Sequence, residues 1–109
     1  MTTWRAADVP AQTGRTVLVT GATGGLGLET AAVLSGAGAR VLVAGRSAER
    51  TARAVSRVAA TASGPPPEPV HLDLADLASV RAAARDVAAR VGALDVLVNN
   101  AGVMHTPPR

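Results

Sequence analysis

A short segment directly after a run of Val and Leu is rich in glycine, and it is the part of the sequence best suited to bind a ligand. It reads Gly21-Ala-Thr-Gly-Gly-Leu-Gly27 and joins the apolar run 16–20 to a helical stretch. A Cβ atom would block such a sharp bend and the close approach of a ligand. The free backbone N–H groups and the helix dipole favour a phosphate there. The segment predicts a dinucleotide diphosphate site, the alternative being a purely structural turn. The residues expected there are Gly21, Thr23, Gly24, Gly25, Leu26 and Gly27.

A basic residue follows the next apolar run. Ala44-Gly45-Arg46 places an arginine, and no acid, at the end of the run 40–44. In dinucleotide folds an acid at this point binds the ribose 2′-OH of NAD, whereas an arginine suits the 2′-phosphate of NADP. A guanidinium can bind that phosphate through two hydrogen bonds, and a carboxylate would repel it. Arg46 therefore favours NADP(H) over NAD(H), with Arg50 close enough to assist. The alternative is that Arg46 only solvates a loop.

These residues need a scaffold, and apolar runs at 16–20, 40–44, 69–73 and 94–99 supply its strands. Three of the runs are so continuous in Val and Leu that they indicate strands buried on both faces of a parallel sheet. Helices are expected at about 25–37, at about 47–62 and after Asp76, which would be an N-cap. The alternation βαβαβαβ predicts an α/β fold: the first half of a Rossmann-type doubly wound parallel sheet, with strand order 3-2-1-4.

Apolar periodicity predicts which face of each helix is buried. The expected stripe of the first helix is Leu26, Thr30, Val33 and Ala37. The expected stripe of the third helix is Leu77, Val80, Ala84, Val87 and Val91. Asp86 and Arg90 in the third helix are spaced for an i,i+4 ion pair. Glycines at 36, 38 and 92 stand where helices should end.

Two motifs resemble those of the short-chain dehydrogenases/reductases. The segment Thr20–Gly27 is similar to that family's TGxxxGxG turn, and Asn99–Gly102 to its NNAG element. The turn also fits the TGxxGxxG form of the extended subgroup, but NNAG is typical of the compact subgroup. The resemblance runs from Thr13 onward, and is strongest to retinol-dehydrogenase-like and protochlorophyllide-reductase-like members. It implies the N-terminal half of an oxidoreductase that transfers hydride between a nicotinamide dinucleotide and a carbonyl or alcohol.

The resemblance assigns further residues to the cofactor. Asp73 matches the position whose carboxylate accepts a hydrogen bond from the adenine amino group, and Leu74 would line the adenine pocket. The alternative role of Asp73 is to cap the following turn, for which Asp76 is better placed. The segment that runs beside the cofactor ribose in the family corresponds to Asn100, Ala101 and Gly102. Asn99 and Asn100 could equally hold the fourth strand to the first. Thr20 and Thr23 could bind the backbone of the glycine turn.

No catalytic residue can be assigned. Members of the family use a Tyr whose pKa is lowered by a Lys in a YxxxK helix, together with a Ser, because hydride transfer leaves an alkoxide that must be protonated. This sequence has no Tyr and no Lys, and every Ser precedes the NNAG element. His105 is expected to be solvated, and His71 to be a packed or an edge residue. We expect a chain that is inactive alone; the alternative is a non-catalytic nucleotide-binding or interaction module completed by another chain.

Length and composition exclude other classes. The 109 residues allow one domain, expected as an N-terminal extension at 1–15 and an NAD(P)-binding domain at 16–109 that is truncated after the fourth strand. Without Cys, and with two His, neither a disulfide framework nor a zinc cluster or other metal site is expected. The sequence shows no signal peptide and no apolar run of membrane-spanning length, which predicts a cytoplasmic protein. The net charge of +3 is not accompanied by stacking aromatics, so no nucleic-acid partner is expected.

The fourth expected strand raises the question of association. Its residues Val96, Leu97 and Val98 form an apolar, uncharged row. In the predicted strand order this strand lies at the edge of the sheet, and unpaired apolar edges favour association. We therefore expect self-association through the edge of the fourth strand.

Overall fold

The fold is a parallel sheet between helices. The computed structural model describes residues 11–21, 25–92 and 94–99. Its elements are β1 (Thr16–Thr20), α1 (Gly25–Gly36), β2 (Arg40–Gly45), α2 (Ala48–Ala59), β3 (Glu68–His71), α3 (Leu77–Arg90) and β4 (Val96–Asn99). The predicted alternation of strands and helices is confirmed. The largest differences from the expected bounds lie at the ends of α2, β3 and β4, which are shorter or shifted by two or three residues.

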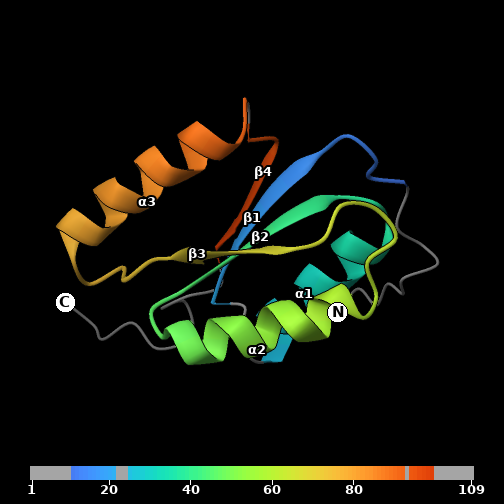
Figure 1. The fold of residues 1–109 in the computed structure, drawn as a ribbon, viewed down its shortest axis with the longest axis horizontal. Helices are drawn as coiled ribbons and strands as arrows, with labels where there is room; N and C mark the ends of the chain where they lie inside the picture. Colours follow the sequence, from blue (N-terminus) through green and yellow to red (C-terminus); the bar gives the residue numbers. More distant parts are fainter. Residues whose placement is uncertain (1–10, 22–24, 93, 100–109) are drawn as a thin grey trace, which may run out of the picture.

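The strands form one sheet in the order β3-β2-β1-β4, as predicted. Every pair is parallel, with Val17 opposite Val41 on β2 and opposite Val96 on β4. Helices α1 and α2 cover one face of this sheet, and α3 covers the other (Figure 1). Because the strands are parallel, their carboxyl ends meet along one edge and their amino ends along the opposite edge. The amino edge carries an ionic network, and the carboxyl edge carries a cavity; both are described below.

The core has two layers because side chains alternate across the strands. Val41 and Val43 of β2 pack in a cluster with α1 and α2, whereas Leu42 and Ala44 pack in a second cluster with α3. The four inner residues of β2 are thus buried, which confirms the prediction of a doubly covered strand. On β4, by contrast, Leu97 is 59% exposed. It pairs with Leu18 on the sheet face that carries α3, and α3 packs against β3 at the other edge of the sheet.

The predicted buried stripe of α1 is wrong. Leu26 is 70% exposed, and the residues buried on this helix are Gly27, Ala31 and Ser35. These small residues recur every four positions and let the helix approach the sheet closely, with Leu28 and Leu34 packed at the flanks. A close helix-to-sheet contact therefore selects small side chains, whereas apolar periodicity predicts that the larger side chains are buried.

The C-terminus of α1 has a Schellman motif, which uses the glycine expected there. Ala39 N–H donates to the carbonyl of Leu34 at 3.1 Å, and Gly38 N–H donates to the carbonyl of Ser35 at 3.1 Å. Gly38 has a φ of 103°, in the region that favours glycine. A Cβ atom at this position would lie 2.8 Å from Oγ1 of Thr13. Gly38 therefore meets both a conformational and a steric requirement.

Helix α3 begins as predicted but buries a partly different face. Asp76 is its N-cap, with Oδ1 accepting a hydrogen bond from Ala78 N–H at 3.0 Å. Val87 is buried as expected, but Leu77 is 62% exposed, and Ala83 is buried in place of Ala84.

In the part of the chain that the structure describes, no helix combines the length and apolar character needed to cross a membrane.

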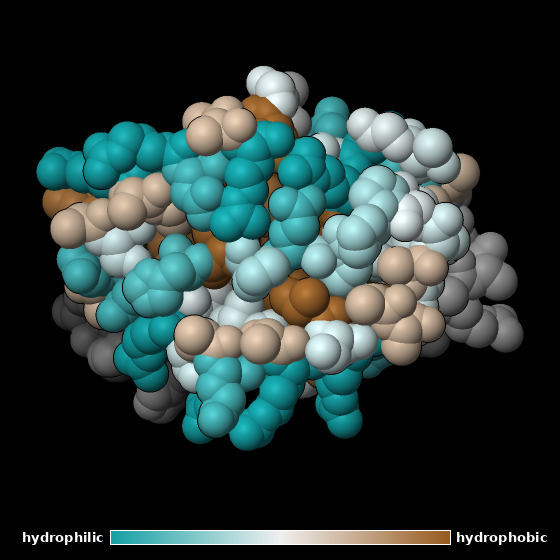
Figure 2. Space-filling view, in the orientation of Figure 1, coloured by the Kyte–Doolittle hydropathy of each residue, from teal (hydrophilic) through white to brown (hydrophobic). Residues whose placement is uncertain are grey.

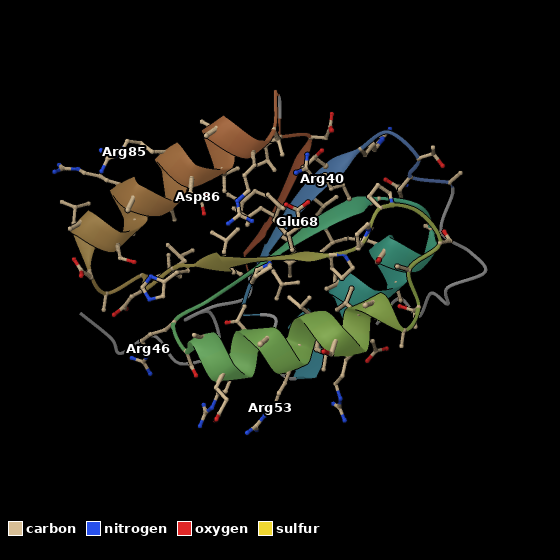
Figure 3. All side chains as sticks on the ribbon, in the orientation of Figure 1. Arg40, Arg46, Arg53, Glu68, Arg85 and Asp86 are labelled. Atoms are coloured by element: carbon tan, nitrogen blue, oxygen red, sulfur yellow. The ribbon has the colours of Figure 1, made fainter. Side chains whose placement is uncertain are left out.

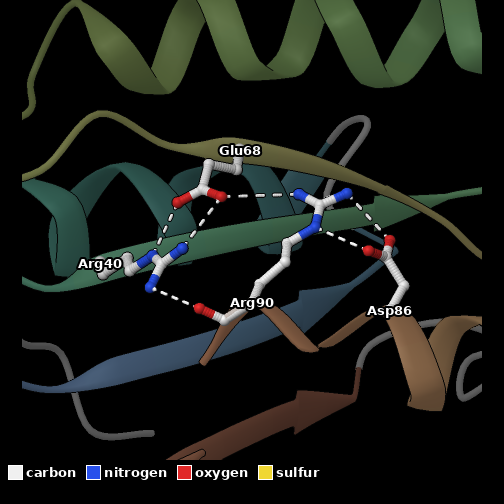
Figure 4. Close-up of polar contacts among 4 residues, drawn as sticks. All are labelled: Arg40, Glu68, Asp86 and Arg90. Carbon is white, nitrogen blue, oxygen red and sulfur yellow. Dashed lines mark hydrogen bonds and ion pairs between the residues drawn. The ribbon is translucent and has the colours of Figure 1, made fainter. Parts of the chain in front are cut away.

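An ionic network ties the amino ends of the strands to the end of α3 (Figure 4). Arg40, the first residue of β2, contacts both carboxylate oxygens of Glu68, the first residue of β3. Arg90 of α3 lies 3.5 Å from Glu68 and also pairs with Asp86, which confirms the predicted i,i+4 pair. Arg40 also donates to the carbonyl of Arg90 at 3.2 Å. These contacts fix β2, β3 and α3 relative to one another.

Candidate functional site

A cavity opens at the carboxyl edge of the sheet, where parallel α/β folds bind their ligands. Its volume of about 390 Å³ lies in the range typical of small-molecule sites. The walls come from the ends of β1 and β2, the start of α2 and the loop after β3. The lining residues are Thr20, Gly21, Ala44, Gly45, Arg46, Ser47, Arg50, Leu72, Asp73, Leu74 and Ala75.

The basic wall of the cavity is the turn from β2 into α2. Ser47 is the N-cap of α2, and its hydroxyl accepts a hydrogen bond from Arg50 N–H at 3.2 Å. The exposed side chains of Arg46 and Arg50 line the cavity on either side of this cap. Figure 3 shows Arg46 at this turn. The start of α2 also carries a partial positive charge, so this wall suits an anionic group.

The basic surface continues along α2 but leaves the cavity. Figure 2 shows hydrophilic side chains along the outer side of this helix, and Figure 3 shows Arg53 pointing away from the sheet. Arg53 forms an exposed ion pair with Glu49 at 3.2 Å. Arg53 and Arg57 are not among the residues that line the cavity. Of these arginines, the cavity wall thus contains Arg46 and Arg50.

The opposite wall is the loop between β3 and α3. Asp73 and Leu74 line the cavity, and Leu74 is exposed toward solvent. The Asp73 carboxylate accepts a hydrogen bond from Ala75 N–H at 3.0 Å, and the Asp73 carbonyl accepts one from Asp76 N–H at 3.0 Å. Asp73 therefore caps its own turn, the alternative role considered for it, and at the same time faces the cavity. The N-cap of α3 is a separate residue, Asp76.

The glycine turn is described at its two ends. Gly21 has a φ of 66° and lines the cavity, and Gly25, the first residue of α1, has a φ of 57°. A Cβ atom at Gly25 would meet nothing within 4 Å, so this residue faces open space at the start of a helix. Gly25, Leu26 and Gly27 form the first turn of α1, outside the lining of this cavity. Thr23 and Gly24 lie outside the described residues.

The remaining predicted residues belong to β1, to β4 and to the segment after it. The Thr20 hydroxyl donates to the carbonyl of Val98 at 3.4 Å, so it joins β1 to β4 and also lines the cavity. Asn99 is the last residue of β4 and pairs with Thr20 in the sheet register. The predicted ribose segment, Asn100, Ala101 and Gly102, lies outside the described residues, as does His105. His71 is exposed at the end of β3, an edge strand.

Sequence reasoning missed two polar residues of this region. Ser47 lies between the two arginines, and a Ser before an apolar helical pattern is a recognisable N-cap signal. Ser79, in the first turn of α3, accepts a hydrogen bond from the backbone N–H of Asp73 at 2.9 Å. The Asp76-x-x-Ser79 spacing places Ser79 near the start of the helix, but nothing in the sequence indicates that it binds Asp73.

Most of the chain corresponds to a known family. Residues 15–109 match the family model described as short chain dehydrogenase. The chain belongs to the short-chain dehydrogenase family, and within it forms the first part of the nucleotide-binding fold.

Curated relatives and solved structures agree with this assignment. The chain is 46% identical over 99 residues to polyprenol dehydrogenase from Mus musculus, a match that covers 91% of this chain and 30% of the relative. It is 43% identical over 104 residues to retinol dehydrogenase 14 from Mus musculus, covering 86% of this chain and 31% of the relative. The chain spans about a third of the length of the curated relatives it matches.

The fold is also similar to that of a dinucleotide complex. The solved structure described as the Pseudomonas aeruginosa RhlG/NADP active-site complex has a TM-score of 0.78 and 36% sequence identity to this chain. The match covers 85% of this chain and 36% of that one. A short-chain alcohol dehydrogenase structure from Sinorhizobium meliloti gives a TM-score of 0.75 at 36% identity, covering 90% of this chain and 38% of that one.

Proposed function

We propose that this chain binds NADP(H), in preference to NAD(H), as the cofactor-binding part of an oxidoreductase. The observation that carries the proposal is the wall formed by Arg46, Ser47 and Arg50 at the end of β2. It places two guanidinium groups and the N-terminus of α2 on one cavity, with no carboxylate contributed by the end of β2. A 2′-phosphate is stabilised by such a wall, whereas a 2′-hydroxyl gains little from it.

Each wall of the cavity then has a role toward the nucleotide. Arg46, helped by Arg50, would bind the 2′-phosphate. Asp73 would accept a hydrogen bond from the adenine amino group, and Leu74 would pack on the adenine ring. The diphosphate would lie at the glycine turn, where positive φ at Gly21 and open space beside Gly25 support its close approach. The further residues proposed for that turn and for the ribose are Thr23, Gly24, Leu26, Gly27, Asn100, Ala101 and Gly102.

The reaction class follows from the family. A bound nicotinamide supplies or accepts hydride, and the substrate would be a carbonyl or an alcohol. The sequence contains neither Tyr nor Lys, so it offers no tyrosine–lysine pair to protonate an alkoxide. We therefore expect the 109 residues to bind the dinucleotide without turning over a substrate.

Titration of the chain with NADPH and with NADH tests the proposal. We expect NADPH to bind at least tenfold more tightly, because the arginine wall interacts with the extra phosphate. The difference should shrink as salt is raised, since both guanidinium groups are exposed and screened. Equal affinity for the two dinucleotides would remove the NADP preference, and no binding of either would overturn the proposal. Turnover of a carbonyl substrate would contradict the expected inactivity.

A further inference from the structure

Asp73, the second residue of the loop between β3 and α3, is held from outside the loop. The backbone N–H of Asp73 donates to the hydroxyl oxygen of Ser79 at 2.9 Å. Ser79 lies in the first turn of α3 and is half-buried, and it is not part of the cavity lining. The bond therefore connects a residue of the cavity wall directly to the helix behind it.

This bond is not needed to cap the helix. The N-cap of α3 is Asp76, whose side chain accepts from Ala78 N–H. The N–H of Asp76 itself donates to the carbonyl of Asp73. The N-cap bond and the bond of the Asp76 N–H are thus made without Ser79, and the hydroxyl of Ser79 binds the Asp73 backbone instead.

Asp73 is anchored at three of its polar groups. Its N–H is bound by Ser79, its carbonyl oxygen by Asp76, and its Oδ1 by Ala75 N–H. Its second carboxylate oxygen, Oδ2, accepts no hydrogen bond from the described residues. A carboxylate fixed in this way on a cavity wall leaves one oxygen to accept a hydrogen bond from a ligand.

We propose that Ser79 is a positioning residue for recognition of the purine base: it fixes the Asp73 backbone so that the carboxylate meets a 6-amino group. The inference rests on the proposed function, because it requires a purine dinucleotide in this cavity. An amino group can donate to the carboxylate, whereas the 6-carbonyl of hypoxanthine would face it with a second acceptor. Base selection then depends on how firmly Asp73 is held, and Ser79 supplies the bond from outside the loop.

The test compares NADPH with reduced nicotinamide hypoxanthine dinucleotide phosphate, which differs at the base. Affinities are measured for the wild-type chain and for Ser79→Ala, Ser79→Thr and Ser56→Ala. Ser56 is an exposed serine of α2, so its variant repeats the same chemical change away from the loop. We expect the wild type to favour the adenine form by about tenfold or more, as for a hydrogen bond to a charged group.

The variants separate positioning from a general loss of structure. Ser79→Ala should reduce the adenine preference to less than about threefold, while Ser79→Thr, which keeps a hydroxyl, and Ser56→Ala should retain it. An unchanged preference in Ser79→Ala would overturn the inference and leave the proposed function standing. So would a wild type that binds both dinucleotides equally. A wild type that binds neither would overturn the proposed function and this inference with it.

Two further measurements keep the inference testable if Ser79→Ala does not fold. Asp73→Asn retains an oxygen for Ala75 N–H and adds an amide donor, so it should shift the preference toward the hypoxanthine form. In the wild type, hydrogen exchange at the Asp73 amide should be slowed relative to the amide of exposed Leu74. Rapid exchange at Asp73, or an unchanged base preference in Asp73→Asn, would contradict the proposed positioning.

Discussion

Arg40 and Glu68 form a two-point ion pair between the first residues of two neighbouring strands. Nε of Arg40 lies 2.7 Å from Oε2 of Glu68, and Nη2 lies 3.1 Å from Oε1. The hydrogen bond from Arg40 lowers the pKa of the Glu68 carboxyl, and the same bond raises the pKa of Arg40. Because β2 and β3 pair side by side, this contact helps to set their register at the end opposite the cavity.

The pH dependence of folding should reflect this pair. The folded state holds the pKa of Glu68 below its unfolded value, so between the two values the unfolded chain binds more protons. The contribution is present above the unfolded pKa and is lost as the pH falls through the folded value. We expect Glu68→Gln to lose about 0.5–1.5 kcal/mol at neutral pH and to show a shallower acid dependence in urea denaturation.

Glu49→Gln provides the matched control for Glu68→Gln. Glu49 also pairs with an arginine, Arg53, but the side chains of both residues are more than two-thirds exposed. Its loss should change the free energy of unfolding by less than about 0.5 kcal/mol. Equal losses in the two variants would show that the strand-end pair has no special role.

Substitution of Arg46 should change cofactor choice more than stability. Arg46→Ala removes a guanidinium from the cavity wall, and we expect the affinity for NADPH to fall about tenfold or more while that for NADH changes little. Titration calorimetry at one fixed ionic strength measures both affinities. Arg53→Ala is the control because Arg53 points away from the sheet (Figure 3). A similar loss of NADPH affinity in both variants would indicate a diffuse charge effect.

The end of α1 should tolerate little change at Gly38. Its positive φ and the 2.8 Å approach of a Cβ atom to Thr13 both oppose a side chain. We expect Gly38→Ala to lower the free energy of unfolding by about 1–3 kcal/mol. In Gly92→Ala the added Cβ meets nothing within 4 Å, so a change of less than about 0.5 kcal/mol is expected. Thermal melts of the two variants should differ clearly, and coincident melts would contradict the steric argument.

Association of the chain should involve β4. Among the described strands, β4 pairs with β1 alone, and Leu97 is exposed on the sheet face that carries α3, which packs against β3 at the other edge of the sheet. We expect the sedimentation coefficient to rise with protein concentration and Leu97→Arg to suppress that rise. Leu77→Arg is the comparison, since Leu77 is similarly exposed but lies on α3. A concentration-independent monomer would contradict self-association through this strand.

Strand positions were predictable because their cause is local and strong, and the strand order followed from the alternation of strands and helices with right-handed crossovers. The Val-Leu run of β2 is buried on both faces, and such runs are typical of central parallel strands. Arg46 was predicted from its place at the end of the second strand, and Asp73 from its match to the adenine-binding position of the family that the sequence resembles. The structure does bring both residues to one cavity.

Helix faces and the support of the loop could not be read from the sequence. Periodicity assigned Leu26 to the core, but the close contact of α1 with the sheet required Gly27, Ala31 and Ser35 instead. Hydrophobicity does not rank small residues above a leucine, so this choice depends on tertiary packing. The bond between Ser79 and Asp73 likewise depends on how the loop folds back on α3. Sequence spacing gives the distance along the chain but not that geometry.

Because the strands are parallel, the contacts that align them and the residues of the candidate site lie at opposite edges of the sheet, which bears on how the protein can evolve. The ionic network lies at the amino ends of the strands and the candidate nucleotide site at their carboxyl ends. Substitutions at the two ends share no contact, so their energetic effects should be additive. We therefore expect that substitution of Arg46 can change ligand preference without loss of the strand alignment to which Arg40 and Glu68 contribute.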